Sequence, residues 1–368
     1  MRIPSFTLQR LLEKEGSELL DAVRSVMDRG LFLLGPETEA FERELGDRFA
    51  AEVVAVGNGT DALIAALLAC GVKPGSEVVV PAMTFSATAI APSEIGATPV
   101  VVDVRAHDLL LDLDAAVAAL TPSTSAVIPV HLYGQVQDLR PLLDACRERG
   151  VAVVEDAAQS VGAEGLGSGV QGDAAATSFY PTKVLGAWGD AGAVITPRPE
   201  VAELVRRWRH YGERDRYRSD ARGRNSRIDE VQAAILRRRL PGLPDGLSER
   251  RRLVRAYQET LPAEVRVVGT PRGGAADALH LFAVRVAARD SVRAALAAVG
   301  IGTGVHYPVA THQHAAIPVR LPAGARVAEA AAEELLSLPL FPGMTVAEVT
   351  EVCVQLGGKP VAGHQSLR

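Results

Sequence analysis

Lys183 is the side chain best suited to covalent chemistry. Only four of the 39 basic residues are lysines, so arginine supplies almost every other cation of the chain. A guanidinium stays protonated, whereas an ε-amine can lose its proton and attack a carbonyl carbon. Phe179 and Tyr180 lead into Lys183, and a glycine-rich stretch, 186–189, follows it. This context favours a Schiff-base nucleophile delivered by a short buried strand over a solvated surface charge.

A carboxylate, Asp156, follows the apolar run 151–154. An acid at the end of a buried strand requires a cationic partner, and a protonated pyridine nitrogen is one such partner. A structural ion pair or a helix cap is the alternative. Lys183 lies 27 residues after Asp156, about one strand-turn-strand passage, and Ser178 lies between them. We therefore expect these three side chains to reach the same edge of a sheet and to form part of a cofactor site.

A glycine turn at 57–63, with the sequence GNGTDAL, predicts the start of a helix after a strand. The first N–H groups of a helix and the hydroxyl of Thr60 would suit a phosphate group. The alternative is that Thr60 or Asp61 only caps the helix.

A second polar segment, 206–227, contains nine arginines and three acids, and runs into a predicted helix. Such a basic loop could contact a pyrophosphate, or it could simply be a solvated surface.

Short apolar runs alternate with helical patterns through the first two-thirds of the chain. The runs are 53–56, 77–80, 99–104, 126–130, 151–154 and 177–179, and the helical patterns are 61–69, 112–120 and 138–149. Near-continuous Val and Ile runs are typical of parallel strands that are covered on both faces. In such sheets ligands bind beyond the carboxyl ends of the strands. We therefore predict an α/β fold with the polar residues named above at one edge of its sheet.

The composition changes near 241–246, and a helical pattern at 247–261 leads into shorter elements. A chain of 368 residues exceeds the size at which one core usually stops growing. We expect two domains: a large cofactor-binding domain at 1–244, which includes the N-terminal segment, and a smaller α+β domain at 245–368.

The bulk composition excludes several classes of protein. The chain is 48% hydrophobic with a net charge of −5, which argues against binding to nucleic acid or to a membrane surface. No stretch has the character of a signal peptide or a membrane span. The three cysteines lie far apart in the sequence and indicate no disulfide. The pair His312/His314 has no third ligand nearby and indicates no metal site. We expect a cytoplasmic protein.

These segments, together with 81–85 (PAMTF), 129–134 (PVHLYG) and 304–308 (GVHYP), resemble the DegT/DnrJ/StrS family of pyridoxal-phosphate-dependent nucleotide-sugar aminotransferases. The resemblance runs from about residue 4 to residue 345, with the motifs in the family order. It implies fold type I, with a mostly parallel seven-stranded sheet between helices and a smaller α+β domain. It also implies pyridoxal 5'-phosphate as cofactor and a homodimer with sites at the subunit interface.

The resemblance further implies a role for each matching residue. Lys183 would bind the cofactor as a Schiff base and later move a proton, and Asp156 would hold the pyridine nitrogen. The other implied contacts are Gln159 to the ring hydroxyl, Phe85 to the ring face, Gly59, Thr60, Asp61 and Ser178 to the phosphate, Asn225 to the phosphate from the partner subunit, and His306 and Tyr307 to the sugar. Family members that dehydrate sugars carry histidine in place of this lysine, unlike this chain.

Within the family, the chain most resembles enzymes that aminate dTDP-3-keto-6-deoxyhexoses, a step of deoxysugar and antibiotic biosynthesis. We therefore expect ping-pong transamination from L-glutamate to a keto sugar nucleotide. The alternatives are a keto-cyclitol substrate, a dehydration, or a non-catalytic protein that keeps the fold. The basic loop favours a nucleotide substrate, and the presence of Lys183 and Asp156 favours an enzyme.

Overall fold

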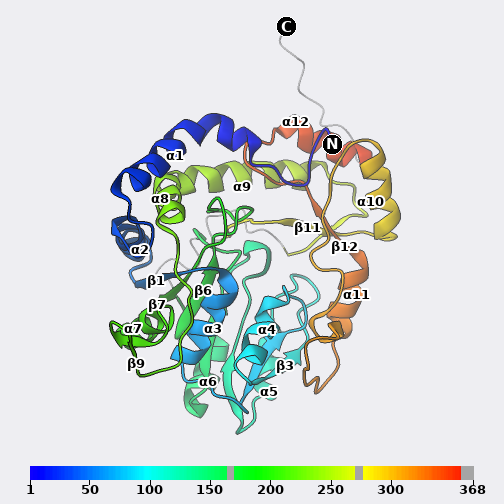
Figure 1. Cartoon of the computed structure of the whole chain (residues 1–368). Helices are drawn as coiled ribbons and strands as arrows, with labels where there is room; N and C mark the ends of the chain where they lie inside the picture. The colour runs from blue at the N-terminus through cyan, green and yellow to red at the C-terminus, as the bar shows by residue number, and fades with distance from the viewer. Residues whose placement is uncertain (164–169, 270–276, 358–368) are drawn as a thin grey trace.

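The computed structural model describes residues 1–163, 170–269 and 277–357, and a seven-stranded sheet lies at its centre (Figure 1). In the order β1-β7-β6-β5-β4-β2-β3, β7 alone runs antiparallel to its neighbours, β1 and β6. The strands are β1 (Glu52–Val56), β2 (Glu77–Pro81), β3 (Thr98–Val102), β4 (Thr124–Val127), β5 (Ala152–Asp156), β6 (Ala174–Ser178) and β7 (Gly192–Thr196). The expected mostly parallel, seven-stranded α/β fold is confirmed.

Both faces of this sheet are buried, which explains the unbroken apolar runs of its strands. Val54 of β1 packs into a core on one face, whereas its neighbour Val53 packs into a core on the other face. Val78 and Val79 of β2 diverge in the same way. Because successive side chains of a strand point to opposite faces, a doubly covered strand must be apolar throughout.

Helices cover the sheet and extend beyond it (Figure 1). The helix α3 (Gly59–Ala69) packs against β6 and β7, and it is buried nearly all round. The other helices are α1 (Gln9–Arg29), α2 (Pro36–Phe49), α4 (Ala87–Glu94), α5 (Leu113–Ala118), α6 (Arg140–Arg149), α7 (Pro199–Trp208), α8 (Glu230–Arg239), α9 (Leu243–Thr260), α10 (Arg289–Ala298), α11 (Arg326–Glu334) and α12 (Val346–Gln355), with short 3-10 turns at Leu132–Gly134, Leu240–Gly242 and Thr311–Gln313.

A second, antiparallel sheet of three strands lies in the C-terminal part of the chain. It consists of β10 (Arg266–Val267), β11 (Phe282–Arg285) and β12 (Leu335–Leu338), in that order. Its core includes residues of α9 and α12, and Ile3 near the N-terminus also packs there. However, Ala328 and Ala331 of α11 pack into a core of the large sheet. The division at residue 244 therefore stays a prediction.

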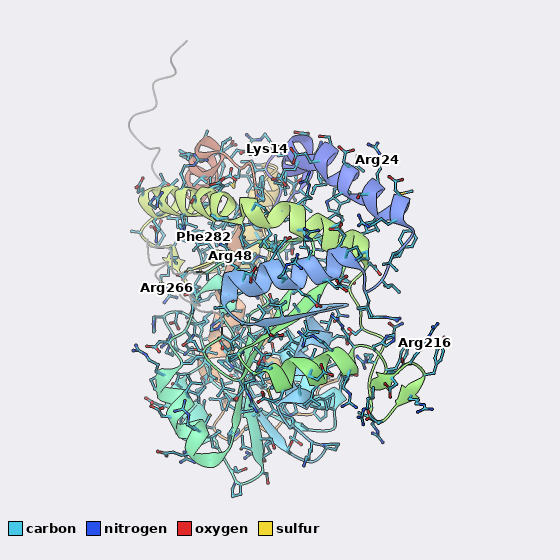
Figure 2. The ribbon with its side chains drawn as sticks, turned by 90° about the vertical axis from the view of Figure 1, so that its left-hand side faces the viewer. Lys14, Arg24, Arg48, Arg216, Arg266 and Phe282 are labelled. Atoms are coloured by element: carbon cyan, nitrogen blue, oxygen red, sulfur yellow. The ribbon has the colours of Figure 1, made fainter. Side chains whose placement is uncertain are left out.

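The arginine-rich segment forms a hairpin that projects from the body of the molecule. Its strands are β8 (Glu213–Asp215) and β9 (Arg218–Ser219), and Figure 2 shows Arg216 at the outer end. Residues 214–225 are exposed to solvent in the single chain. Within the described ranges, no helix has the length and apolarity needed to cross a membrane.

Candidate active site

The connection between β6 and β7 carries Lys183, and hydrogen bonds to neighbouring elements hold this connection in place. The N–H of Phe179 donates to the carbonyl of Ala191 at 2.8 Å, which closes the loop at its base. The N–H of Trp188 donates to Oε1 of Gln232 on α8 at 2.8 Å. Lys183 is thereby presented at the carboxyl end of β6, as the sequence predicts.

The environment of Lys183 favours its neutral amine. Burial disfavours the ammonium form and lowers the pKa of Lys183 from 10.5 to about 8, although the nearby Asp156 acts in the opposite direction. At pH 8 about half of the amine would therefore be uncharged. A neutral amine is the form that attacks a carbonyl and accepts a proton.

The carboxylate of Asp156 ends β5 and is buried, with 6% of the residue exposed. The hydroxyl of Thr88 donates to its Oδ2 at 2.8 Å, and the N–H of Ala158 donates to its Oδ1 at 3.2 Å. Burial raises the pKa of Asp156, and these hydrogen bonds oppose that rise. No cationic side chain in the described ranges forms an ion pair with it. A buried carboxylate in this state is suited to a cationic ligand group.

The N-terminus of α3 and the end of β6 together form an anion cradle. Asn58 caps the helix, because its Oδ1 accepts the N–H of Asp61 at 2.8 Å. Thr60 is therefore not the cap, and it faces the cavity with Ser178. A Cβ atom on Gly59 would lie 2.8 Å from Cβ of Ser178, so only glycine allows this close approach. The first N–H groups of the helix have no intrahelical partner and suit a phosphate.

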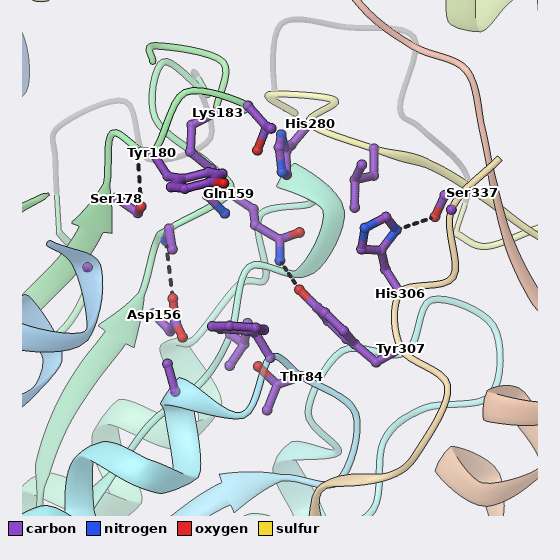
Figure 3. Close-up of a pocket in the computed structure, with 18 of the residues that line it drawn as sticks. Thr84, Asp156, Gln159, Ser178, Tyr180, Lys183, His280, His306, Tyr307 and Ser337 are labelled. Atoms are coloured by element: carbon purple, nitrogen blue, oxygen red, sulfur yellow. Dashed lines mark hydrogen bonds between the residues drawn. The ribbon is translucent and has the colours of Figure 1, made fainter. Parts of the chain in front are cut away.

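These side chains line one cavity of about 650 Å³ (Figure 3). Figure 3 shows Lys183 and Tyr180 across the cavity from His306 and Tyr307. Of the residues expected at the site, those that line the cavity are Gly59, Thr60, Phe85, Asp156, Gln159, Ser178, Lys183, His306 and Tyr307. No arginine from the described part of the chain lines it. The single chain thus brings most of the expected residues together.

Gln159 joins two walls of the cavity. Its Oε1 accepts the N–H of Tyr133 at 2.7 Å, and its Nε2 donates to the hydroxyl of Tyr307 at 3.2 Å. The ring of Phe85 lies 5.9 Å from that of Tyr307 between centroids. Phe85 is 54% exposed, so its ring is available to stack against a planar ligand. On the same wall, His306 Nδ1 lies 2.9 Å from the hydroxyl of Ser337.

Two residues expected to contact the phosphate lie outside the cavity wall. The carboxylate of Asp61 accepts hydrogen bonds from Arg224 at 2.7 Å and from Ser226 at 2.8 Å, so it ties α3 to the segment after the hairpin. Asn225 is exposed and accepts a hydrogen bond from Arg227 at 3.0 Å. Asp61 therefore anchors the start of α3, and Asn225 does not line the cavity of its own chain.

The structure adds residues to this site that the sequence did not reveal. Thr84 and His280 line the cavity, and Thr88 lies directly behind Asp156. His280 is 6% exposed, its Nδ1 has no hydrogen-bond partner in the described structure, and burial lowers its pKa well below the usual value. A lone threonine in an alanine-rich helix and a lone histidine beside a strand carry no distinctive pattern, so only the fold reveals them.

Two further histidines, His131 and His312, have protein partners. His131 Nε2 lies 2.8 Å from Glu155 Oε2, and both residues are fully buried. His131 is therefore held by a buried carboxylate and has a structural role. His312 Nε2 lies 2.9 Å from Glu329 Oε1 on α11. The described residues contain no cluster of ligating side chains that could hold a metal ion.

The cavity fits pyridoxal phosphate on three independent grounds. It presents a lysine with a depressed pKa, a buried carboxylate that no cationic side chain of the described ranges pairs with, and a helix N-terminus packed against the serine at the end of β6. An aldehyde, a pyridine nitrogen and a phosphate are the groups that these features would hold. Lys183, Asp156 and the pair Thr60/Ser178 are accordingly the residues that would hold them.

Curated relatives match nearly the whole chain. The erythromycin biosynthesis sensory transduction protein EryC1 of Saccharopolyspora erythraea is 43% identical over 94% of this chain and 96% of that protein. The dTDP-3-amino-3,4,6-trideoxy-alpha-D-glucose transaminase of Streptomyces venezuelae is 41% identical, covering 93% and 92%. A UDP-N-acetyl-3-dehydro-alpha-D-glucosamine 3-aminotransferase of Acidithiobacillus ferrooxidans is 38% identical, covering 95% and 96%. The relatives thus include transaminases named for different sugar nucleotides.

Solved structures agree with this assignment. The crystal structure of S. venezuelae DesV matches with a TM-score of 0.90 and 38% identity, over 96% of this chain and 97% of that one. A Bacillus subtilis protein with bound pyridoxamine phosphate matches with a TM-score of 0.85 and 30% identity, over 93% and 81%. A sequence model of the DegT/DnrJ/EryC1/StrS aminotransferase family matches residues 13–357. The chain is a sugar aminotransferase that uses pyridoxal phosphate, and it belongs to the DegT/DnrJ/EryC1/StrS aminotransferase family.

Proposed function

We propose that this enzyme aminates a dTDP-3-keto-6-deoxyhexose with L-glutamate as amino donor, in a ping-pong reaction. The observation that carries the proposal is that one cavity holds Lys183, Asp156 and the anion cradle beside a wall of uncharged hydrogen-bonding side chains. That wall includes His306, Tyr307 and Ser337, which suit the hydroxyl groups of a sugar. The relative named for a dTDP-3-amino sugar supports the choice of nucleotide.

In this proposal, the chain's own residues divide the work. When bound, pyridoxal phosphate supplies the group that carries the amine from one substrate to the other. The ε-amine of Lys183 holds and returns the proton at the reacting carbon, a task that its lowered pKa permits. Asp156 keeps the ring nitrogen charged, and Thr60, Ser178 and the N-terminus of α3 hold the phosphate in place.

We further propose that the enzyme acts as a homodimer. Asn225 lies beside the protruding hairpin and outside the cavity of its own chain, so a second copy could bring it to the phosphate. The basic hairpin around Arg216 would then approach the nucleotide part of the substrate in the neighbouring site.

The two half-reactions can be tested separately with purified, cofactor-loaded enzyme. L-glutamate alone should convert the cofactor to its amine form, which changes its absorbance. A panel of keto substrates should follow: dTDP-3-keto-6-deoxyhexoses, a UDP-linked 3-keto sugar and a keto-cyclitol, each read by mass spectrometry. We expect amination of the dTDP sugars with at least tenfold higher kcat/KM. Amination of the cyclitol with no turnover of any sugar nucleotide would contradict the proposal.

A further inference from the structure

Two threonine hydroxyls form a short chain behind Asp156. Thr88 on α4 is fully buried, and its Oγ1 lies 2.8 Å from Oδ2 of Asp156. The hydroxyl of Thr84 lies 2.8 Å from that of Thr88, and Thr84 is 2% exposed in the cavity wall. Figure 3 shows Thr84 at the same end of the cavity as Asp156. The chain of contacts therefore runs from the cavity wall to the back of the carboxylate.

The chemistry of these groups fixes which one donates each hydrogen bond. An ionised carboxylate can only accept hydrogen bonds, and a threonine hydroxyl has one proton to donate. When Asp156 is charged, Thr88 must therefore donate to Asp156. The oxygen of Thr88 is then left as an acceptor, so Thr84 must donate to Thr88. The two hydroxyls align in one direction, and each polarises the next.

This alignment matters because the surroundings of Asp156 oppose its charge. Burial raises the pKa of the carboxyl group, and the Thr88 hydrogen bond is the largest influence that lowers it. A hydrogen bond to a charged group is about twice as strong as one between neutral groups. His131 and Lys183 also favour the charged form, but neither forms an ion pair with Asp156. Among the residues that the structure describes, Thr88 is thus the side chain that bonds directly to Asp156 and favours its carboxylate form.

We propose that Thr88, aligned by Thr84, is a positioning residue that keeps Asp156 ionised and oriented toward the ring nitrogen of the cofactor. The inference rests on the proposed role of Asp156. It adds that this role depends on a hydroxyl that does not itself touch the cofactor. Valine has the branched shape of threonine but lacks its hydroxyl, so Thr88→Val removes the hydrogen-bond donor at this position.

The test compares variants of the full-length protein by two measurements. The first is the dissociation constant of pyridoxal phosphate from protein stripped of cofactor. The second is the nitrogen-15 signal of ring-labelled cofactor at saturation, which reports protonation of the ring nitrogen. Ser93→Ala is the matched control, because it removes a hydroxyl from the same helix that donates to the carbonyl of Ala89.

We expect Thr88→Val to weaken cofactor binding about tenfold and to shift the ring signal toward the unprotonated form. Thr88→Ser should restore both values to within about twofold, because serine keeps the donor. Thr84→Val should weaken binding about two- to threefold, since it removes only the second link. If Thr88→Val does not fold, the Thr84→Val and Thr88→Ser variants carry the test. Ser93→Ala should match the unmodified enzyme.

Asp156→Asn distinguishes a failure of the role proposed for Thr88 from a failure of the role proposed for Asp156. If this variant loses cofactor affinity and ring protonation while Thr88→Val and Thr84→Val keep both, the hydroxyl chain has only a packing role and the proposal is wrong. If Asp156→Asn also keeps both values, the role proposed for Asp156 fails, and the proposal for Thr88 fails with it.

Discussion

The cofactor end and the mouth of the cavity are built in different ways. The cofactor end, formed by Asp156, Thr60, Ser178 and Lys183, lies at strand ends and a helix start that hydrogen bonds fix within one chain. The mouth carries the exposed rings of Phe85 and Tyr180, which are 54% and 48% exposed. Exposed aromatic surface beside a cavity is typical of a site that a ligand or a second subunit covers. The cofactor end is therefore largely fixed within one chain, whereas the mouth leaves aromatic surface open to a ligand or a second subunit.

The largest effect should come from the cofactor end itself. We expect Lys183→Arg to reduce transamination about a thousandfold or more, because a guanidinium can neither form the Schiff base nor return the proton. Steady-state turnover of glutamate provides the measurement. Lys14→Arg, on the exposed side of α1, should stay within twofold of the unmodified enzyme. More than a tenth of the activity in Lys183→Arg would remove the lysine from the mechanism.

Asp156→Asn should lower kcat/KM about a hundredfold. It keeps the shape of the side chain but removes the charge that pairs with the ring nitrogen, and breaking a buried pair costs about 3 kcal/mol. Glu155→Gln gives a sharp contrast, since that carboxylate pairs with His131 and accepts the N–H groups of Gln171 and Gly172. We expect it to lower the melting temperature while folded enzyme keeps its turnover. Equal catalytic losses in both variants would show that the effect is only structural.

The amine of Lys183 should titrate far below an ordinary lysine. Burial disfavours its ammonium form, so the neutral, reactive amine appears as the pH rises through about 8 instead of 10.5. At pH 8, the uncharged fraction of Lys183 in the cofactor-free protein should therefore be about a hundredfold larger than that of an ordinary exposed lysine. Competitive labelling with acetic anhydride and peptide mapping measures this ratio. A titration midpoint near 10 would contradict the predicted environment.

At the contact proposed between subunits, Asn225→Ala should have a smaller effect, a loss of about tenfold in cofactor affinity, because one hydrogen bond to a charged phosphate is removed. A mixture of Asn225→Ala and Lys183→Arg subunits tests where this residue acts. If Asn225 serves the neighbouring site, mixed dimers contain one fully native site and recover activity beyond the average of the separate variants. No recovery, or a fully active monomer, would place the contact within one chain.

The same contrast explains what the sequence could predict. Apolar runs in the sequence identified six strands, because a strand that is buried on both faces consists of apolar residues almost throughout. The run at 192–196 that forms β7 is equally apolar, but composition does not reveal that it runs antiparallel. Lys183 and Asp156 were predictable because a charged side chain at the end of a buried strand is costly, which indicates a binding partner or a chemical role.

The remaining features depend on distant parts of the chain. Asp61 bonds to Arg224, and Thr88 bonds to Asp156, across 163 and 68 residues respectively. Local patterns contain no trace of such pairings. For the same reason, Thr60 was a plausible cap until the fold showed Asn58 in that place.

The most direct test of the central claim is to identify the lysine that carries the cofactor. Borohydride reduction of the loaded enzyme, followed by digestion and mass spectrometry, fixes the cofactor to its lysine. The account predicts the added mass on Lys183 alone among Lys14, Lys73, Lys183 and Lys359, and its disappearance when L-glutamate is added before reduction. Attachment to another lysine, or labelling that glutamate does not remove, would contradict it.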